Sequence, residues 1–148
     1  MKARLIALIT VLALALAMTA GAKRQETIVF WYGATQDEKA AYERMVAQFE
    51  RENPDIRVNA MLVPMSYIER KLILSVAGGV PPDVVRFYAH LGGELMSRGG
   101  LEPLDDFVKK YKFDVQDFYK VGLTQNTYRG RLYGIPWILS PYALFYNK

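Results

Sequence analysis

The chain has 148 residues, of which 51% are hydrophobic and 23% are charged, and this composition predicts one globular domain rather than a disordered chain. Its net charge of +4 is spread along the sequence without a basic cluster, which argues against nucleic-acid binding. The absence of cysteine excludes disulfides, thiolate metal sites, a cysteine nucleophile and a lipid-modified amino-terminal cysteine.

Residues 1–22 have the pattern of a signal peptide. Lys2 and Arg4 precede an apolar run, and Ala20 and Ala22 supply the small residues that signal peptidase accepts. The apolar run is shorter than the roughly 20 residues that a membrane-spanning helix needs, so the pattern favours cleavage near Ala22 over an uncleaved anchor. We therefore expect a periplasmic or secreted protein that is not lipid-anchored.

The next stretch has the pattern of a strand-helix-strand unit. Residues 27–32 form an uninterrupted β-branched and aromatic run, which predicts a buried parallel strand at the centre of a sheet. Thr35 and Glu38 have the spacing of a capping box, so we expect a helix to begin there and to end before Pro54. Residues 56–63 predict the second strand, and the crossover between the strands should be right-handed.

The same alternation continues. Ser66 and Glu69 have the spacing of a second capping box, and the glycine pair at 78–79 is expected to end that helix. Residues 83–88 predict a third strand, and residues 91–98 predict a short helix. This order of strands and helices predicts an α/β layer fold with a mainly parallel sheet flanked by helices.

The last third of the chain is predicted as two helices followed by two extended runs. Asp105 and Asp106 are expected at the amino-terminal end of a helix, where the helix dipole favours acidic side chains. Asp114 is expected to cap another helix that runs through residue 123. Residues 132–139 and 142–146 have β-rich composition and are joined by a proline, which interrupts any sheet ladder.

Several segments together resemble the extracellular solute-binding proteins of ABC transporters, and in particular the carbohydrate-binding branch that includes the maltose-binding proteins. The two extended runs with a proline-aromatic corner between them resemble that family's first crossover between lobes. The other matching segments are Phe-Trp-Tyr at 30–32, Phe-Glu-Arg-Glu-Asn-Pro at 49–54, Gly-Val-Pro-Pro-Asp-Val-Val at 79–85, Gly-Leu-Glu-Pro-Leu-Asp at 100–105, Tyr-Gly-Ile-Pro at 133–136 and Leu-Phe-Tyr-Asn-Lys at 144–148.

The resemblance implies a periplasmic-binding-protein-like lobe and a division of the chain. Residues 23–139 would form the amino-terminal lobe, and residues 140–148 would form the hinge crossover and the start of a truncated second lobe, most of which is missing. The implied function is a non-catalytic receptor that binds a small solute, a mono- or oligosaccharide, and docks to an ABC transporter permease. No cofactor is implied.

Ligands of open parallel sheets bind beyond the carboxyl ends of the strands, and this rule selects the candidate site residues. Aromatic faces suit the apolar face of a sugar ring, and tyrosine hydroxyls suit its hydroxyl groups. Packing in the core is the competing interpretation for each of the aromatic residues. The predicted ligand-binding residues are Trp31, Tyr32, Tyr88, His90, Trp137 and Tyr142.

Enzyme motifs are scarce. The chain has no Gly-x-Ser-x-Gly, no phosphate-binding glycine loop and a single histidine, so no catalytic or metal-binding residues are predicted. A secreted glycoside hydrolase fragment stays open as an alternative, because that chemistry needs only two carboxylates across a cleft. A truncated reading frame without a function of its own is the third possibility.

Overall fold

The computed structural model describes residues 25–138 and 143–147. The predicted signal peptide, residues 1–22, and the predicted site residue Tyr142 lie outside the described residues. None of the described helices is both long and apolar enough to span a bilayer.

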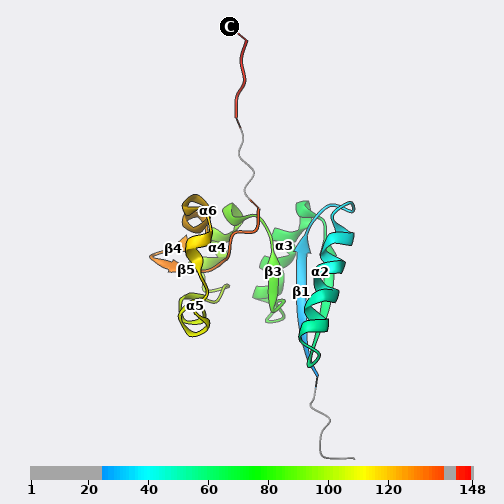
Figure 1. The fold of residues 1–148 in the computed structure, drawn as a ribbon. Coiled ribbons are helices and arrows are strands. Elements are labelled where there is room, and N and C mark those ends of the chain that lie inside the picture. Colours follow the sequence, from blue (N-terminus) through cyan, green and yellow to red (C-terminus); the bar gives the residue numbers. More distant parts are fainter. Residues whose placement is uncertain (1–24, 139–142, 148) are drawn as a thin grey trace, which may run out of the picture.

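Three parallel strands form the main sheet in the order β2-β1-β3 (Figure 1). As predicted, the strand that begins the described part lies in the centre, and the alternation of strands and helices confirms the α/β class. The elements in chain order are β1 (Glu26–Gly33), α2 (Lys39–Glu52), β2 (Ile56–Val63), α3 (Met65–Ala77), β3 (Val84–Arg86), η1 (Ala89–Leu91), α4 (Gly92–Ser97), α5 (Asp105–Tyr111), η2 (Val115–Asp117), α6 (Lys120–Gln125), β4 (Thr127–Tyr128) and β5 (Arg131–Leu132).

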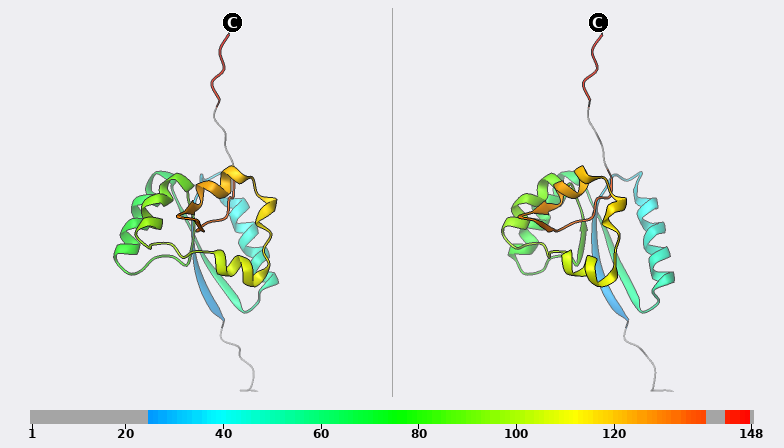
Figure 2. Two further views of the ribbon diagram at one scale, coloured as in Figure 1. Left: turned by 90° about the vertical axis from the view of Figure 1, so that its left-hand side faces the viewer. Right: turned by 60° about the vertical axis from the view of Figure 1, so that its left-hand side comes forward.

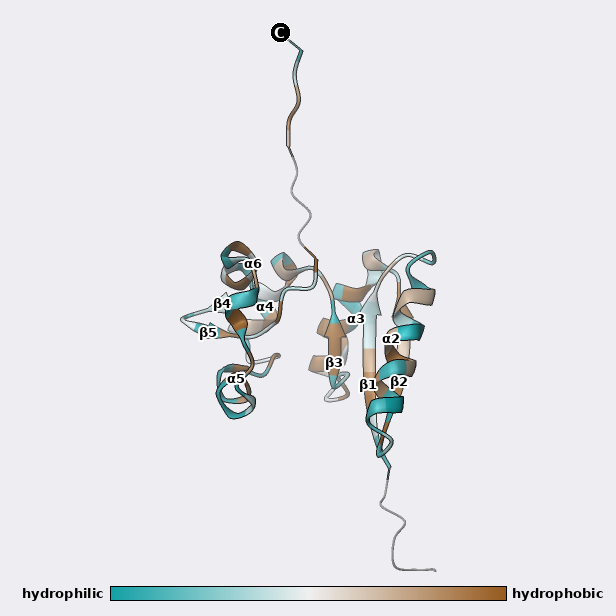
Figure 3. Cartoon of the chain, viewed as in Figure 1, coloured by the Kyte–Doolittle hydropathy of each residue, from teal (hydrophilic) through white to brown (hydrophobic). Residues whose placement is uncertain are grey.

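Helices α2 and α3 cover opposite faces of the sheet (Figure 2). Successive residues of a strand point to opposite faces, so Trp31 packs with Ile68 of α3 while Tyr32 packs with Tyr42 of α2. Figure 3 shows a hydropathy pattern that agrees with this packing. Most of β3 is hydrophobic, and α2 alternates between hydrophobic and hydrophilic stretches. The core therefore consists of two layers, one on each side of β1.

The third strand is shorter than the predicted 83–88. β3 covers only Val84–Arg86 and pairs with β1 from Phe30 to Tyr32, so its ladder ends one residue before the end of β1. Beyond it the chain turns into the short helices η1 and α4, where a single helix over 91–98 was predicted. The composition of residues 83–88 indicated a strand correctly, but only its first half pairs with β1, before the chain turns into η1.

The first helix begins later than its capping pattern predicted. The backbone N–H of Thr35 donates to Glu38 Oε2 at 2.8 Å, and the Thr35 hydroxyl donates to the same oxygen at 3.1 Å. This is one half of a capping box, because no hydrogen bond runs from the Glu38 N–H to Thr35, and α2 begins at Lys39. The pair instead stabilises the turn that leads into the helix.

The second capping box was predicted wrongly. Helix α3 begins at Met65, directly after Pro64, and no side chain caps it. Proline fixes φ at a value that suits the residue before a helix, so the helix starts ahead of Ser66. The predicted end is confirmed, because Gly79 has φ +73° and the N–H of Val80 donates to the carbonyl of Ser75 at 2.9 Å, as in a Schellman motif.

The helix predicted from Asp114 through residue 123 is interrupted. Asp114 Oδ1 accepts a hydrogen bond from the N–H of Gln116 at 2.8 Å, but it caps only the short helix η2. Phe118 and Tyr119 then adopt extended backbone angles before α6 begins. In contrast, α5 begins with Asp105 and Asp106 in its first turn, as the helix-dipole argument predicted.

A β-hairpin with a two-residue loop follows α6, and the sequence analysis missed it. Strands β4 and β5 pair antiparallel around Arg129 and Gly130, whose φ angles of +47° and +78° fit a type I′ turn. The hairpin is tied to α5, because the N–H of Leu104 donates to the carbonyl of Leu132 at 2.7 Å and Arg131 lies 3.6 Å from Asp105.

The two extended runs predicted near the end of the chain do not form strands in their described parts. Only Leu132 of the first run belongs to a strand, and residues 133–138 and 143–147 have no regular structure. Leu144 and Phe145 are 92% and 91% exposed, so they have no partner strand in the described part of the chain. A β-rich composition alone does not make these residues a strand, because a strand needs a neighbouring strand to pair with.

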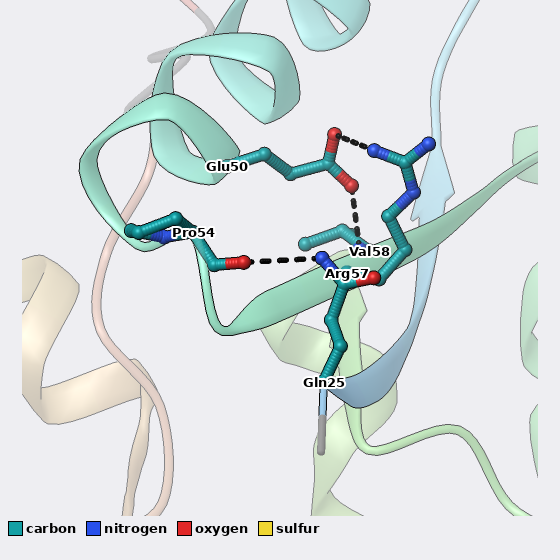
Figure 4. Close-up of polar contacts among 5 residues, drawn as sticks. All are labelled: Gln25, Glu50, Pro54, Arg57 and Val58. Atoms are coloured by element: carbon teal, nitrogen blue, oxygen red, sulfur yellow. Dashed lines mark hydrogen bonds and ion pairs between the residues drawn. The ribbon is translucent and has the colours of Figure 1, made fainter. Parts of the chain in front are cut away.

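A carboxylate of α2 binds one backbone N–H on the outer edge of β2 (Figure 4). Glu50 of α2 accepts a hydrogen bond from the backbone N–H of Val58 at 2.8 Å and another from Arg57 Nη1 at 3.2 Å. Beside this contact, the Gln25 side chain donates to the carbonyl of Pro54 at 3.1 Å. The Glu50 carboxylate thus occupies a strand N–H that would otherwise be free to pair with another chain.

Candidate functional site

The three parallel strands end at one edge of the sheet, with Gly33, Val63 and Arg86 as their last residues. In Figure 1 this is the edge to which the β1 arrow points, and the chain after β5 passes over it. Open parallel α/β sheets bind ligands beyond this edge. We therefore take the side chains around it as the candidate site.

Arg86 crosses this edge from β3 toward α3. Its Nη1 donates to the carbonyl oxygen of Gly33 at the end of β1, and it lies 3.3 Å from Sδ of Met65 at the start of α3. Gly33 makes this crowded arrangement possible, because a Cβ at that position would come within 2.3 Å of Met65 Sδ. The guanidinium is thus held at the middle of the edge by neutral acceptors.

Two predicted site residues that follow β3 form an exposed pair. The rings of Tyr88 and His90 stack with their centroids 5.4 Å apart and an interplanar angle of 23°. Tyr88 is 50% exposed, and the Arg86 guanidinium lies 6.0 Å from the centre of its ring. The pair offers solvent a flat aromatic surface next to a positive charge.

Trp137 belongs to a second group of aromatic rings, which connects it to β1 through Tyr42 and Tyr32. Its side chain is 59% exposed, and its ring lies 6.1 Å from that of Tyr42, which stacks on Tyr32 at 4.5 Å. The structure thus brings together two predicted residues, Trp137 and Tyr32, through Tyr42, which the sequence analysis did not select. Tyr42 lies on the apolar face of α2, and that pattern predicts core packing without indicating what the ring contacts.

Trp31 and Tyr32 lie inside the lobe. They are only 8% and 2% exposed, on opposite faces of the sheet, and each belongs to a core cluster. Two buried polar atoms nearby, Trp31 Nε1 and the Tyr42 hydroxyl, have no hydrogen-bond partner in the described part of the chain. The predicted ligand role of Trp31 and Tyr32 stays a prediction.

Two ionisable groups near the edge have shifted pKa values. The hydrogen bonds from Thr35 lower the pKa of Glu38, and the positive charge of Arg86 adds a smaller effect in the same direction. Burial raises the pKa of Tyr32, and the negative charge of Glu43 raises it further. Both groups therefore keep their ordinary charge near neutral pH.

The described residues contain no group of three or more His, Asp or Glu side chains that could hold a metal ion. The side chains at the edge are instead exposed aromatic rings, a histidine and a guanidinium.

The amino-acid sequence from residue 32 to residue 148 matches the family model for bacterial extracellular solute-binding proteins. The chain belongs to this family. The match spans most of the chain and includes α2 and all later elements.

Relatives in the family share moderate identity with the chain. A binding protein of Brucella abortus is 30% identical over 147 residues, which are 99% of this chain and 34% of the relative. The sn-glycerol-3-phosphate-binding periplasmic protein UgpB of Escherichia coli is 27% identical over 146 residues, or 93% of this chain and 32% of the relative. The chain thus spans about a third of the length of the curated relatives it matches.

The fold agrees with a solved member of the family. The sugar-binding protein MalE from Xanthomonas citri superposes with a TM-score of 0.68 and 32% sequence identity, over 75% of this chain and 28% of that one. The resemblance to carbohydrate-binding members is therefore confirmed for the fold and the family, and these relatives are binding proteins.

Proposed function

We propose that this chain forms a ligand-binding lobe of an extracytoplasmic receptor that captures a sugar or a sugar-like polyol for an ABC importer. The observation that carries the proposal is the exposed aromatic group of Tyr88, His90 and Trp137 at the carboxyl edge of the sheet. Such rings cover the apolar face of a pyranose, while their polar atoms bind hydroxyl groups.

The names of the relatives support this ligand class. MalE of Xanthomonas citri is a sugar-binding protein, and UgpB of Escherichia coli is named for binding sn-glycerol 3-phosphate. Both ligands are small and carry several hydroxyl groups. In the proposal Tyr88, His90 and Trp137 contact the ligand from the surface, Trp31 and Tyr32 contact it from the end of β1, and Tyr142 adds a contact from the crossover.

The lobe supplies one wall of the site. The chain spans about a third of the length of its relatives, and a small ligand buried between two walls needs a second one. We propose that residues 23–139 are the amino-terminal lobe, that residues 140–148 lead into the second lobe, and that closure of the lobes over the ligand presents the receptor to the permease.

Calorimetry on the full-length protein that contains this chain tests the proposal. We expect one member of a panel of mono- and oligosaccharides and polyol phosphates to bind with micromolar affinity or better, as is needed for capture at low concentration. Incubation with the same oligosaccharides should release no reducing ends, because the receptor returns its ligand unchanged. Catalytic release of reducing sugar would instead favour a glycoside hydrolase.

A further inference from the structure

Arg86 is a partly buried cation at the candidate site without an acidic partner. In the part of the chain that the structure describes, four ion pairs form, and they engage Lys39, Arg57, Arg98 and Arg131. Arg86 is absent from this group, and Gly33 and Met65 offer it only neutral acceptors. Partly buried guanidinium groups are normally paired, because removing the charge from water without compensation is costly.

The hydrogen bonds of Arg86 leave much of the guanidinium unused. Both of its described hydrogen bonds come from Nη1, and none comes from Nε or Nη2. These two nitrogens point their N–H groups in a fixed planar fork, which matches two oxygens of a phosphate or a carboxylate. A guanidinium has five N–H donors and no acceptor, so the fork is suited to an anion.

The unused donors of Arg86 lie at the edge of the sheet where the strands end, beside the exposed aromatic rings. The Tyr88 ring lies 6.0 Å from the guanidinium, so an anionic group bound there would sit beside the exposed aromatic surface. Arg86 lowers the pKa of Glu38 through its charge, but the two side chains form no ion pair among the described residues, and Thr35 donates both of its hydrogen bonds to Glu38 Oε2. Lys71 also has no acidic partner among the described residues, but its ammonium group lies 4.2 Å from the centre of the Trp31 ring, which it covers.

We infer that the ligand of this site carries an anionic oxygen group, a phosphate or a carboxylate, on a sugar or polyol, and that Arg86 binds this group. The inference rests on the proposed function and narrows its ligand class. In this arrangement the aromatic side chains bind the carbon skeleton, and Arg86 distinguishes a charged ligand from its neutral counterpart.

Matched pairs of ligands test the inference by calorimetry on the full-length protein. The pairs are sn-glycerol 3-phosphate and glycerol, glucose 6-phosphate and glucose, and glucuronate and glucose, with maltotriose as a neutral oligosaccharide. We expect one anionic member to bind at least about ten-fold more tightly than its neutral partner. The phosphate and carboxylate pairs distinguish the two sources of the anionic group.

Variants then assign the preference to Arg86. Arg86→Gln should weaken the anionic ligand by about ten-fold or more, and it should remove most of the preference over the neutral partner. Arg98→Gln is the matched control, because Arg98 is exposed, follows α4 directly, and forms its one ion pair among the described residues with Glu94 of that helix. If Arg86→Gln does not fold by circular dichroism, Arg86→Lys keeps the charge without the fork and should still weaken binding.

Each outcome decides the question. Tight binding of maltotriose with no gain for any anionic ligand would overturn the inference and leave the proposed function intact. Unchanged anion affinity in a folded Arg86→Gln or Arg86→Lys variant would also overturn it. Failure of every neutral and anionic ligand to bind would remove both the inference and the proposed function.

Discussion

Asp83 pairs with Val29 as if it were a further residue of β3. Its backbone N–H donates to the carbonyl of Val29 at 3.0 Å, and its carboxylate accepts a hydrogen bond from the N–H of Val29 at 2.8 Å. The side chain therefore supplies the acceptor that a strand backbone would supply, one step before the β1–β3 ladder begins. This gives a physical reason for aspartate at the entry to the third strand.

Asp83→Ala should destabilise the protein by about 1 kcal/mol, because it removes an acceptor from the N–H of Val29 in a partly solvated position. Asp83→Asn is the control, since its amide oxygen can still accept the bond and most of the stability should return. Urea denaturation of the full-length protein measures both. Equal stability of the alanine variant and the wild type would show that the contact contributes nothing.

Gly33→Ala should cost about 1–3 kcal/mol, because the new methyl group enters a filled space. Its Cβ would lie 2.3 Å from Met65 Sδ and 3.3 Å from the backbone oxygen of Arg86. In a Met65→Ala background the cost of Gly33→Ala should shrink, and a double-mutant cycle by urea denaturation measures the coupling. Additive effects of the two changes would contradict this explanation.

The sequence predicted the elements whose signals are local. Gly79 ends α3 because a left-handed backbone angle favours glycine, and Asp105 begins α5 because of the helix dipole. The end of β3 and the loss of a strand after Leu132 depend on which neighbour is available for pairing. Such distant partners leave no trace in the composition of the segment itself.

The candidate site was predictable only in its location. The strand-end rule selected Tyr88 and His90, the predicted crossover added Trp137, and the structure places all three at the surface. Trp31 and Tyr32 also lie near a strand end, but both faces of β1 are covered by helices, so both side chains are buried. Arg86 was missed because an arginine inside a predicted strand suggests a solvent-facing position rather than a guanidinium folded over the sheet edge.

Trp137→Ala should weaken ligand binding in the full-length protein by about 1–3 kcal/mol, because the exposed indole is a stacking surface for the ligand. Tyr111→Ala is the matched control, since Tyr111 is 68% exposed on α5, outside the candidate site. Calorimetry measures the affinities, and circular dichroism checks the fold. Unchanged affinity in a folded Trp137→Ala variant would remove this residue from the site.

Glu38 should contribute stability that depends on pH. Hydrogen bonds from Thr35, followed by the charge of Arg86, hold its pKa below the ordinary value of 4.5. A carboxylate with a lowered folded-state pKa stabilises the protein above its unfolded-state pKa, and this contribution disappears as the pH falls through the folded-state pKa. Glu38→Gln should therefore lower the melting temperature at neutral pH and have no effect at about pH 2.

Asp37→Asn is the control for this titration, because it removes a charge from the same turn without touching the hydrogen bonds of Thr35. Calorimetric melting of the three proteins across this pH range gives the comparison. A difference between Glu38→Gln and the wild type that persists at low pH would show that the effect is steric rather than electrostatic.

Export should remove residues 1–22. The small residues Ala20 and Ala22 predict cleavage before Lys23. Intact-mass analysis of the exported protein should therefore find Lys23 at its amino terminus. Replacing Ala22 with a bulky residue, as in Ala22→Leu, should block processing, and exported protein that still begins with Met1 would refute the prediction.

The edge contact of Glu50 is made entirely within residues 25–63. A nascent chain that leaves a ribosome or a secretion pore amino end first can therefore assemble β1, α2 and β2 with the Val58 N–H on the β2 edge already bonded. Until Val84 emerges, the other edge of β1 has no partner strand at Phe30, Trp31 and Tyr32, with which β3 pairs later. A chaperone that holds the unfinished chain would therefore find an extended, apolar strand edge at these three residues.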